Sequence, residues 1–342
     1  MLKVVRLNAV TYPVEQQEID ELASADATLV PIEGTTPQEI GAATADCDAL
    51  IVIAAKVTAS IVRGLERCRT IARAGAGIDN IAVDAATERG IIVSNVPDYG
   101  TCEVAEHTLT LLLAAARQLP EMMRAMHAGR WSARHDPRVH RLAGRVLGLL
   151  GFGAIARAVA ARAGAFGLRL LAHDPRGDRQ AAERHGVELV GFNRLLRESD
   201  FLSIHVPLTG QTRHLIDAAA LAQMKPTAIL INTARGAIVD EAALVEALRS
   251  RRLGAAALDV FETIDVFSLD APPPPHPLLD LNNVILTPHS AGSSVEATRD
   301  SKVRAARHVA QVLTGRWPDF VVNSGVRPWF DLPGAGGAPE SS

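Results

Sequence analysis

A short apolar segment followed by two closely spaced glycines constrains the fold of this chain more than any other feature. Residues 146–150 predict a buried strand, Gly151 and Gly153 follow at once, and an alanine-rich helical pattern comes next. Asp174 stands about twenty residues further on, at the end of a second apolar strand. This order of strand, glycine turn, helix and acidic residue is that of a dinucleotide-binding βαβ unit.

The positions in this loop have physical roles that limit the choice of residue. Gly151 permits a tight turn, and Gly153 lets the backbone approach a pyrophosphate at the N-terminus of the next helix. The Asp174 carboxylate can accept hydrogen bonds from a ribose 2′-hydroxyl and would repel a 2′-phosphate, so we expect NAD, while Arg176 leaves NADP use open. The loop residues expected to bind the cofactor are Gly151, Phe152, Gly153, Ala154 and Ile155.

Composition and cysteine usage exclude several other classes of protein. The length of 342 residues predicts about two domains, and a net charge of −3 gives no reason to expect nucleic acid or a membrane as a partner. Cys47, Cys68 and Cys102 are scattered, so neither a disulfide framework nor a metal site is indicated. We expect a cytoplasmic protein, because no signal peptide pattern is present and the longest apolar run, Leu111–Ala116, cannot span a bilayer.

Strand and helix patterns alternate along the chain, which predicts an α/β fold with parallel sheets covered on both faces. Helical patterns run from Thr101 past Met126 and from Ser293 to Leu313, and the proline-rich segment 270–277 predicts an extended loop. Strands are predicted at 2–7, 49–53, 70–72, 91–93, 146–150, 168–172, 201–205, 228–232, 255–260 and 284–287.

The nucleotide-binding pattern begins near residue 100, so α/β segments precede and follow it. We expect two doubly wound parallel-sheet domains, with a Rossmann NAD-binding domain inserted into a discontinuous, flavodoxin-like substrate domain. The predicted boundaries are 1–100 and 289–333 for the substrate domain, 101–288 for the NAD-binding domain and 334–342 for a disordered tail.

Five short segments, taken together in this order, resemble the motifs of one enzyme family. They are Arg73–Asn80 (RAGAGIDN), Val104–His107 (VAEH), Gly151–Gly153 (GFG), Asn232–Gly236 (NTARG) and Thr287–His289 (TPH). The chain is similar to the D-isomer-specific 2-hydroxyacid dehydrogenases, which include D-3-phosphoglycerate dehydrogenase and hydroxypyruvate reductases. The resemblance extends from about residue 49 to 323 and looks closest to bacterial members near the C-terminal-binding proteins, corepressors with the same fold.

The resemblance implies roles for an arginine and a histidine that each follow a predicted strand. Arg235 would hold a 2-oxo acid, because a guanidinium can bind a carboxylate and the adjacent carbonyl oxygen with its fork of donors. His289 would be the general acid in reduction and the general base in oxidation, because imidazole exchanges protons near neutral pH.

The chain departs from the family at the acid that supports this histidine. The family places a glutamate shortly after Asp-Val-Phe, but the usual spacing from Arg235 leads to Ile264. Counting back from His289 leads instead to Asp270, which implies an insertion, and Glu262 and Asp265 are also close in sequence. Asp265 or Asp270 is therefore our candidate, and the alternative is that no acid contacts the histidine.

Other predicted site residues also come from the resemblance. The Gly75–Gly77 loop can present backbone N–H groups to a carboxylate, although a tight turn before a helix is an equal alternative. This loop contributes Ala76 and Gly77 to the predicted substrate site. Asp259 would hydrogen-bond the nicotinamide carboxamide. The remaining predicted cofactor residues are His205, Val206, Pro207, Thr212, Thr233 and Ala234.

The resulting functional hypothesis is an NAD-dependent oxidoreductase that acts on a small D-2-hydroxy or 2-oxo acid. The alternatives are an NAD(H)-binding regulatory protein like the corepressors, and a catalytically weakened relative. We also expect a homodimer, because the helical pattern of residues 103–126 is apolar over more than one face and the matching family region forms a two-fold contact.

Overall fold

The computed structural model describes residues 1–131, 139–264 and 275–332. It divides into two compact units: unit 1 contains Met1–Gly100 and the residues from Ser294 onward, and unit 2 contains Thr101–Ser293. The return to unit 1 therefore begins at 294 rather than at the predicted 289. The physical reason is that backbone N–H groups of residues 289–291 hydrogen-bond to Asp259 within unit 2.

Unit 1 contains a parallel sheet with the flavodoxin-like strand order. Five strands pair in the order β2-β1-β3-β4-β5 within its described residues. They are β1 (Leu2–Arg6), β2 (Ala27–Pro31), β3 (Ala49–Val52), β4 (Thr70–Arg73) and β5 (Ile92–Ser94). This order confirms the predicted fold class for unit 1.

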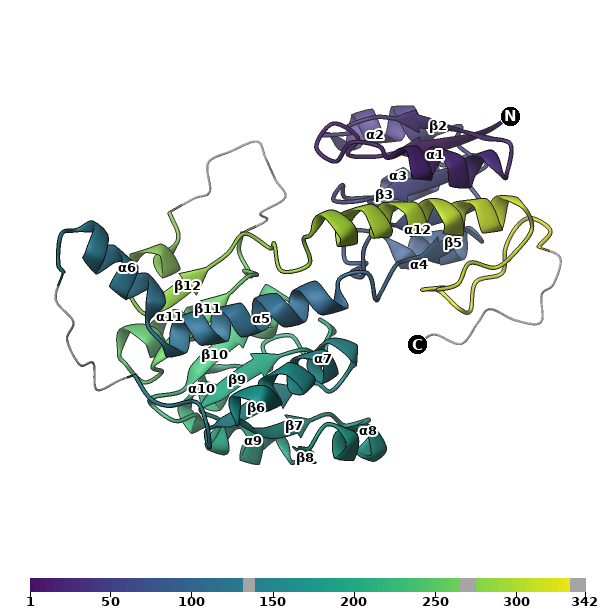
Figure 1. Cartoon of the computed structure of the whole chain (residues 1–342). Helices are drawn as coiled ribbons and strands as arrows, with labels where there is room; N and C mark the ends of the chain where they lie inside the picture. The colour runs from purple at the N-terminus through teal and green to yellow at the C-terminus, as the bar shows by residue number, and fades with distance from the viewer. Residues whose placement is uncertain (132–138, 265–274, 333–342) are drawn as a thin grey trace. The chain divides into compact units, whose positions relative to one another are not determined.

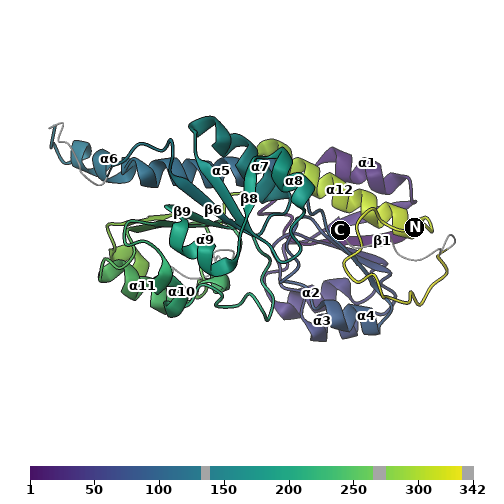
Figure 2. The ribbon, with the colours of Figure 1, turned by 90° about the horizontal axis from the view of Figure 1, so that it is seen from below.

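Helices cover both faces of the unit 1 sheet, as Figure 2 shows, with α1 and α12 on one face and α2, α3 and α4 on the other. The helices are α1 (Gln16–Ala23), α2 (Pro37–Thr44), α3 (Ala59–Gly64), α4 (Val83–Glu88) and α12 (Val295–Leu313). All four residues of β3 are buried, because neither face of a central strand in such a sheet reaches water.

Unit 2 contains a larger parallel sheet of the Rossmann type. Seven strands in the described part of this unit pair in the order β12-β11-β10-β9-β6-β7-β8. They are β6 (Val146–Leu150), β7 (Arg169–His173), β8 (Val187–Leu189), β9 (Phe201–Ile204), β10 (Ile229–Asn232), β11 (Ala255–Leu258) and β12 (Val284–Leu286). The chain order reverses between β6 and β9, which is where ligands bind in open parallel sheets, beyond the carboxyl ends of the strands.

Helices α5, α7 and α8 cover one face of the unit 2 sheet, and α9, α10 and α11 cover the other (Figures 1 and 2). Buried alanines on α7 belong to the hydrophobic cluster that also contains residues of α5 and β6. The elements are α5 (Thr101–Ala116), α6 (Leu119–His127), α7 (Ala154–Ala163), η1 (Gly164–Phe166), α8 (Arg179–Arg184), α9 (Phe192–Glu198), α10 (Ala218–Gln223), η2 (Gly236–Ile238), α11 (Glu241–Arg249) and η3 (Pro277–Asp280).

The structure corrects three secondary-structure predictions. The helix predicted from Thr101 past Met126 is two helices, because Gln118 adopts a left-handed backbone conformation (φ +51°) and Pro120 lies in the first turn of α6. β2 was not predicted because none of its five residues is fully buried. β8 was not predicted because its central residue is the exposed Glu188, so the strand has no continuous apolar run.

Some predictions fall on residues that the structure does not describe. Asp265, Asp270, most of the proline-rich segment and the predicted tail lie outside the described residues. Of the helices in the described ranges, none is both long enough and apolar enough to cross a membrane.

Candidate active site

The glycine turn after β6 is closed by the loop that follows β9. Gly151 has φ +91°, and a Cβ atom placed there would lie 2.9 Å from the carbonyl carbon of His205. Backbone hydrogen bonds fix the turn, from Gly151 N to the His173 oxygen (2.8 Å) and from His205 N to the Leu150 oxygen (2.7 Å). Any side chain at position 151 would therefore separate β6 from β9 at the point where the strand order reverses.

The space beside Gly153 fits a bound dinucleotide. Apart from Gly153 and its two chain neighbours, no atom of the described residues lies within 4 Å of a Cβ atom placed at Gly153, so the protein itself does not require glycine there. Gly153 is the N-cap of α7, and no side chain caps the N–H groups of its first turn. These N–H groups and the open space suit an anionic pyrophosphate.

Asp174 has a structural role in addition to the predicted one. Its Oδ2 accepts a hydrogen bond from Phe152 N, and its Oδ1 accepts one from Arg176 N, both at 2.9 Å. The carboxylate therefore fixes the glycine loop to the end of β7. Each carboxylate oxygen has a second lone pair, so Asp174 can still accept hydrogen bonds from ribose hydroxyls.

The loop after β9 is held by its own side chains. The His205 ring lies 2.8 Å from Ser203 Oγ, and burial lowers the pKa of His205 to about 4, so this imidazole is neutral at physiological pH. Thr212 Oγ1 donates to the Pro207 oxygen at 2.6 Å. Val206 lies against Gly151, with its Cγ1 3.0 Å from a Cβ atom placed there. Of the predicted cofactor residues of this loop, His205 and Val206 thus border the glycine turn.

Arg235 stands in a loop that Asn232 shapes. The Asn232 side chain donates to the Arg235 backbone oxygen at 2.9 Å and accepts from Ala234 N at 3.0 Å. A Cβ atom at Gly236 would lie 1.9 Å from the Phe261 carbonyl carbon, so the backbone after β11 packs directly on this glycine. Asn232 and Gly236 therefore determine where the Arg235 backbone can lie.

His289 stands on a tight turn with an unusual backbone. Its φ is +53°, which is uncommon for a residue with a side chain, and its N–H donates to the backbone oxygens of Asp259 (2.8 Å) and Thr287 (3.1 Å). The Asp259 carboxylate accepts hydrogen bonds from Thr287 Oγ1, Ser290 N (3.0 Å) and Ala291 N (2.9 Å). One carboxylate thus holds the turn that carries the predicted proton donor.

The Asp259 side chain is fully buried. Burial alone would raise the pKa of Asp259, but hydrogen bonds from His107, Thr287 and two backbone N–H groups hold it below its usual value. Asp259 is therefore an anion that organises the turn after β12. The contact with a nicotinamide carboxamide that the resemblance implies stays a prediction.

The acid partner of His289 is not identified by the described residues. Asp265 and Asp270 lie outside them, and Ile264 cannot accept a hydrogen bond through its side chain. Glu262 contacts a different loop, because its Oε1 lies 2.6 Å from His214 Nε2 and 3.1 Å from Arg213 Nη1. The structure thus brings Glu262 to the loop after β9.

The predicted substrate loop of unit 1 follows β4. Gly75 has φ +153°, and a Cβ atom there would lie 2.2 Å from a guanidinium nitrogen of Arg73. Val96 N donates to the Gly75 oxygen (3.1 Å) and Asn95 Nδ2 donates to the Ala76 oxygen (2.7 Å). The loop is therefore fixed through its carbonyl groups, and Ala76 is exposed.

Comparison with known proteins gives a consistent assignment. A sequence model of the D-isomer-specific 2-hydroxyacid dehydrogenase NAD-binding domain matches residues 109–291. The D-3-phosphoglycerate dehydrogenase of Methanocaldococcus jannaschii is 42% identical over 316 residues, covering 92% of this chain and 59% of that enzyme. The chain belongs to the D-isomer-specific 2-hydroxyacid dehydrogenase family. It spans less than three fifths of the length of the first phosphoglycerate dehydrogenases that it matches.

Two further family members match over most of their own length. The glyoxylate reductase of Korarchaeum cryptofilum is 40% identical over 285 residues, covering 82% of this chain and 84% of that enzyme. The crystal structure of D-lactate dehydrogenase from Aquifex aeolicus, complexed with NAD and lactic acid, has a TM-score of 0.79 and 26% identity. It covers 91% of this chain and 96% of that chain. These relatives support the dehydrogenase interpretation rather than the regulatory alternative.

Sequence reasoning missed a polar cluster in this family member, in which Glu241 and His276 are buried and Thr263 is exposed. Glu241 Oε1 accepts hydrogen bonds from Thr263 Oγ1 (2.7 Å) and His276 Nε2 (2.9 Å), and its Oε2 accepts one from Glu262 N (3.1 Å). Glu241 begins α11, while Thr263 and His276 stand on either side of the undescribed residues 265–274. No local motif could indicate it, because the three side chains come from separate segments.

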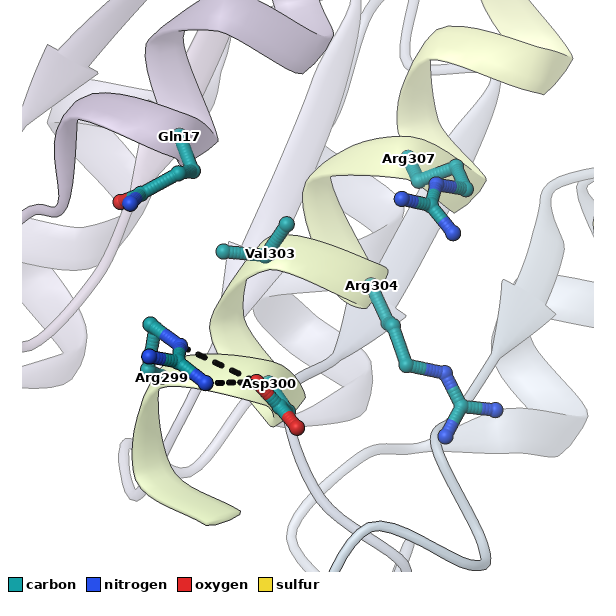
Figure 3. A pocket seen from close by; sticks show the side chains of 6 residues that line it. All are labelled: Gln17, Arg299, Asp300, Val303, Arg304 and Arg307. Carbon is teal, nitrogen blue, oxygen red and sulfur yellow. Dashed lines mark hydrogen bonds and ion pairs between the residues drawn. The ribbon is translucent and has the colours of Figure 1, made fainter. Parts of the chain in front are cut away.

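A pocket in unit 1 of this family member is lined by none of the predicted site residues. It has a volume of about 270 Å³ and lies between α1 and α12, as Figure 3 shows. Its lining residues are Gln17, Arg299, Asp300, Val303, Arg304 and Arg307. The three arginines pair with Asp300, Asp98 and Glu21, at 3.0, 2.7 and 2.7 Å respectively. These pairs offset the positive charge, so we assign the pocket no ligand.

Proposed function

We propose that this chain is an NAD-dependent oxidoreductase that interconverts a small D-2-hydroxy acid and the corresponding 2-oxo acid. The observation that best supports this proposal is the strand register, in which Asn232 of β10 pairs with Leu258 of β11, and Leu258 pairs with Leu286 of β12. Arg235 follows β10 and His289 follows β12, so both leave the carboxyl edge of the sheet, from the two strands on either side of β11. That edge is where the fold binds ligands.

Arg235 and His289 would have different roles at the substrate. Arg235 would bind the carboxylate and polarise the adjacent carbonyl with its planar fork of donors. His289 would donate a proton to the carbonyl oxygen in reduction and accept one from the alcohol in oxidation. The chemistry that NAD(H) supplies when bound is hydride transfer at the carbon that carries this oxygen.

Turnover of NADH with a panel of 2-oxo acids tests this function. Glyoxylate, hydroxypyruvate, pyruvate and longer 2-oxo acids should distinguish the substrate class. We expect His289→Asn and Arg235→Ala each to lower kcat/KM roughly 10²- to 10⁴-fold. Arg249→Ala, an exposed arginine on α11, is the control and should behave as the wild type. Failure of every 2-oxo acid to oxidise NADH would overturn the proposal.

We also propose that the cofactor is NAD rather than NADP. The support is the Asp174 carboxylate, which stands at the end of β7 beside the glycine loop. Asp174→Ala should narrow the ratio of NADH to NADPH affinity, which fluorescence titration can measure. The ratio of the two affinities tests the preference for NAD, because loss of the hydrogen bond from Phe152 N would weaken the binding of NADH and NADPH alike. A wild type that prefers NADPH would contradict the assignment.

The acid beside His289 is proposed to be Asp265 or Asp270. Replacement by asparagine would remove a charged partner of the protonated imidazole, so the apparent pKa for reduction should fall. Catalysis should suffer more than NADH affinity, because the acid acts on the proton donor. Unchanged pH–rate profiles for Asp265→Asn and Asp270→Asn would mean that neither aspartate supports the histidine.

Finally, we propose a cytoplasmic homodimer. The support for dimerisation is helix α6, which buries none of its residues within the chain. Exposed apolar residues gather there: Leu119, Met122, Met123 and Met126. The support for the compartment is that Cys47, Cys68 and Cys102 are all free thiols, as in reducing environments.

A further inference from the structure

Two neighbouring residues of α5 contact the two loops that carry Arg235 and His289. His107 Nε2 lies 3.0 Å from Thr287 Oγ1 and 3.5 Å from Asp259 Oδ1. Thr108 Oγ1 lies 2.9 Å from Thr233 Oγ1. Thr233 begins the loop of Arg235, and Thr287 begins the turn of His289, so adjacent side chains of one helix contact the start of both segments.

The direction of the hydrogen bonds at His107 follows from the chemistry of its partners. The Asp259 carboxylate can only accept, so the hydroxyl proton of Thr287 is donated to it. The Thr287 oxygen then has only lone pairs to offer, and His107 Nε2 must carry a proton and donate. A relay of donors therefore runs from His107 through Thr287 to the buried carboxylate, which also holds Ser290 N and Ala291 N.

The direction at Thr108 follows from the same argument. Its hydroxyl donates to the Val104 backbone oxygen one helical turn earlier, at 2.7 Å. Because a hydroxyl has one proton, Thr233 must be the donor in the contact between the two threonines. Thr108 is fully buried and Thr233 is 9% exposed, so loss of the Thr108 oxygen would leave a buried donor without that acceptor.

We propose that His107 and Thr108 are positioning residues that set the spacing between Arg235 and His289. The proposal rests on the proposed function, because it assigns these two side chains to one substrate. A rigid helix on the sheet face holds both loops at their first residues. Since His107 acts on the turn of the proton donor and Thr108 on the loop of the substrate-binding arginine, their loss should affect different kinetic constants.

Matched variants separate positioning from packing. Thr108→Val removes the hydroxyl at nearly constant volume, and Thr108→Ser restores it. The control is Thr110→Val on the same helix, because Thr110 Oγ1 also donates to a backbone oxygen one turn earlier, that of Glu106, but Thr110 is exposed. For the other position, His107→Leu removes the donor and His107→Gln restores an N–H.

The expected results differ between the two positions. His107→Leu should lower kcat roughly ten- to a hundredfold with little change in KM for the oxo acid, because the proton donor acts in the transition state. Thr108→Val should lower kcat and also raise KM for the oxo acid, because it loosens the loop of Arg235, the residue that binds the substrate. His107→Gln and Thr108→Ser should recover most of the loss, and Thr110→Val should match the wild type.

Hydrogen exchange provides a readout that does not depend on turnover. His107→Leu should speed exchange of the Ser290 and Ala291 amides, whose acceptor is Asp259, and Thr108→Val should speed exchange in residues 233–236. If the wild type reduces no 2-oxo acid but these amides respond, the proposed function fails and the positioning contacts stand. Unchanged exchange in both variants, or equal losses in Thr108→Val and Thr110→Val, would overturn the inference.

Discussion

Gly151 and Gly153 stand two positions apart in one loop and are glycines for different reasons. Gly151 must be glycine for the protein, because its backbone is left-handed and a side chain would strike the His205 backbone. Gly153 has an ordinary extended backbone and open space beside it. The second glycine is therefore explained by a ligand that approaches the backbone and not by the fold.

This difference predicts a variant that binds the cofactor poorly but folds normally. Gly153→Ala should leave the melting temperature unchanged and weaken NADH binding roughly tenfold or more, because the methyl group fills space that the pyrophosphate needs. Titration of NADH fluorescence measures the affinity. Gly191→Ala is the matched control, since Gly191 is also a helix N-cap with open space around it. A normal NADH affinity in Gly153→Ala would place the pyrophosphate elsewhere.

His308 on α12 is a second residue whose surroundings predict a measurable property. It is fully buried in unit 1, neither ring nitrogen has a hydrogen-bond partner among the described residues, and Asp319 Oδ2 lies 3.8 Å away. Burial lowers the pKa of His308 to about 4, although Asp319 acts in the opposite direction. The imidazole is therefore neutral in the folded chain at physiological pH.

The free energy of unfolding should consequently fall in mild acid. Between about pH 6.5 and pH 4 the unfolded chain binds a proton at His308 that the folded chain does not, so stability decreases as the pH falls, by up to about 3 kcal/mol. His308→Leu should remove this part of the pH dependence in chemical denaturation at pH 7 and pH 5. Parallel pH profiles for wild type and variant would disprove the assignment.

At the scale of secondary-structure elements, the cluster of Glu241, Thr263 and His276 joins α11 to the segments on both sides of residues 265–274. All three groups that face the carboxylate of Glu241 are donors, because Glu262 N is the third. A carboxylate can accept all of them, whereas an amide of the same shape presents donors of its own.

Glu241→Gln should therefore be destabilising although it conserves shape. At least one buried donor loses its acceptor, which should lower the free energy of unfolding by about 1–3 kcal/mol. Chemical denaturation measures this change. Glu246→Gln, at an exposed position of the same helix, should have no effect. Equal stability of the two variants would mean that the cluster does not hold α11 to its neighbours.

At the scale of the whole molecule, α6 exposes an apolar surface that a single chain does not cover. Met122 and Met123 are 48% and 51% exposed, beside Leu119 and Met126, which also reach the surface. Contiguous apolar surface of this kind marks an interaction site, and in closed two-fold assemblies the same patch meets its own copy. This is the physical basis for the proposed homodimer.

Replacement of one of these methionines should dissociate the dimer. Met123→Glu introduces a charge that would be buried in the contact, so light scattering at micromolar concentration should change from dimer to monomer. Ile19→Glu is the control, because Ile19 on α1 has a similar exposed fraction, 44%. A wild type that is already monomeric at this concentration would refute the proposal.

The amino-acid sequence by itself determined the features that depend on local chemistry. Buried strands, the glycine turn and the acid at the end of β7 follow from hydrophobic periodicity and from turns that only glycine adopts. Arg235 and His289 were predicted through the family resemblance, because each belongs to a short motif that follows a predicted strand. The break at Gln118 was missed because the apolar pattern continues across it, and only the backbone conformation reverses.

Only the tertiary structure decided how these parts are held. His107 and Thr287 lie 180 residues apart, and Glu241 and His276 lie 35 residues apart, so no motif could pair them. The cofactor role that the resemblance implies for Asp259 stays a prediction, and only the structure shows that its buried carboxylate also binds the turn of His289. The physical reason is that a hydrogen bond requires a donor and an acceptor at about 3 Å, and packing alone brings distant residues to that distance.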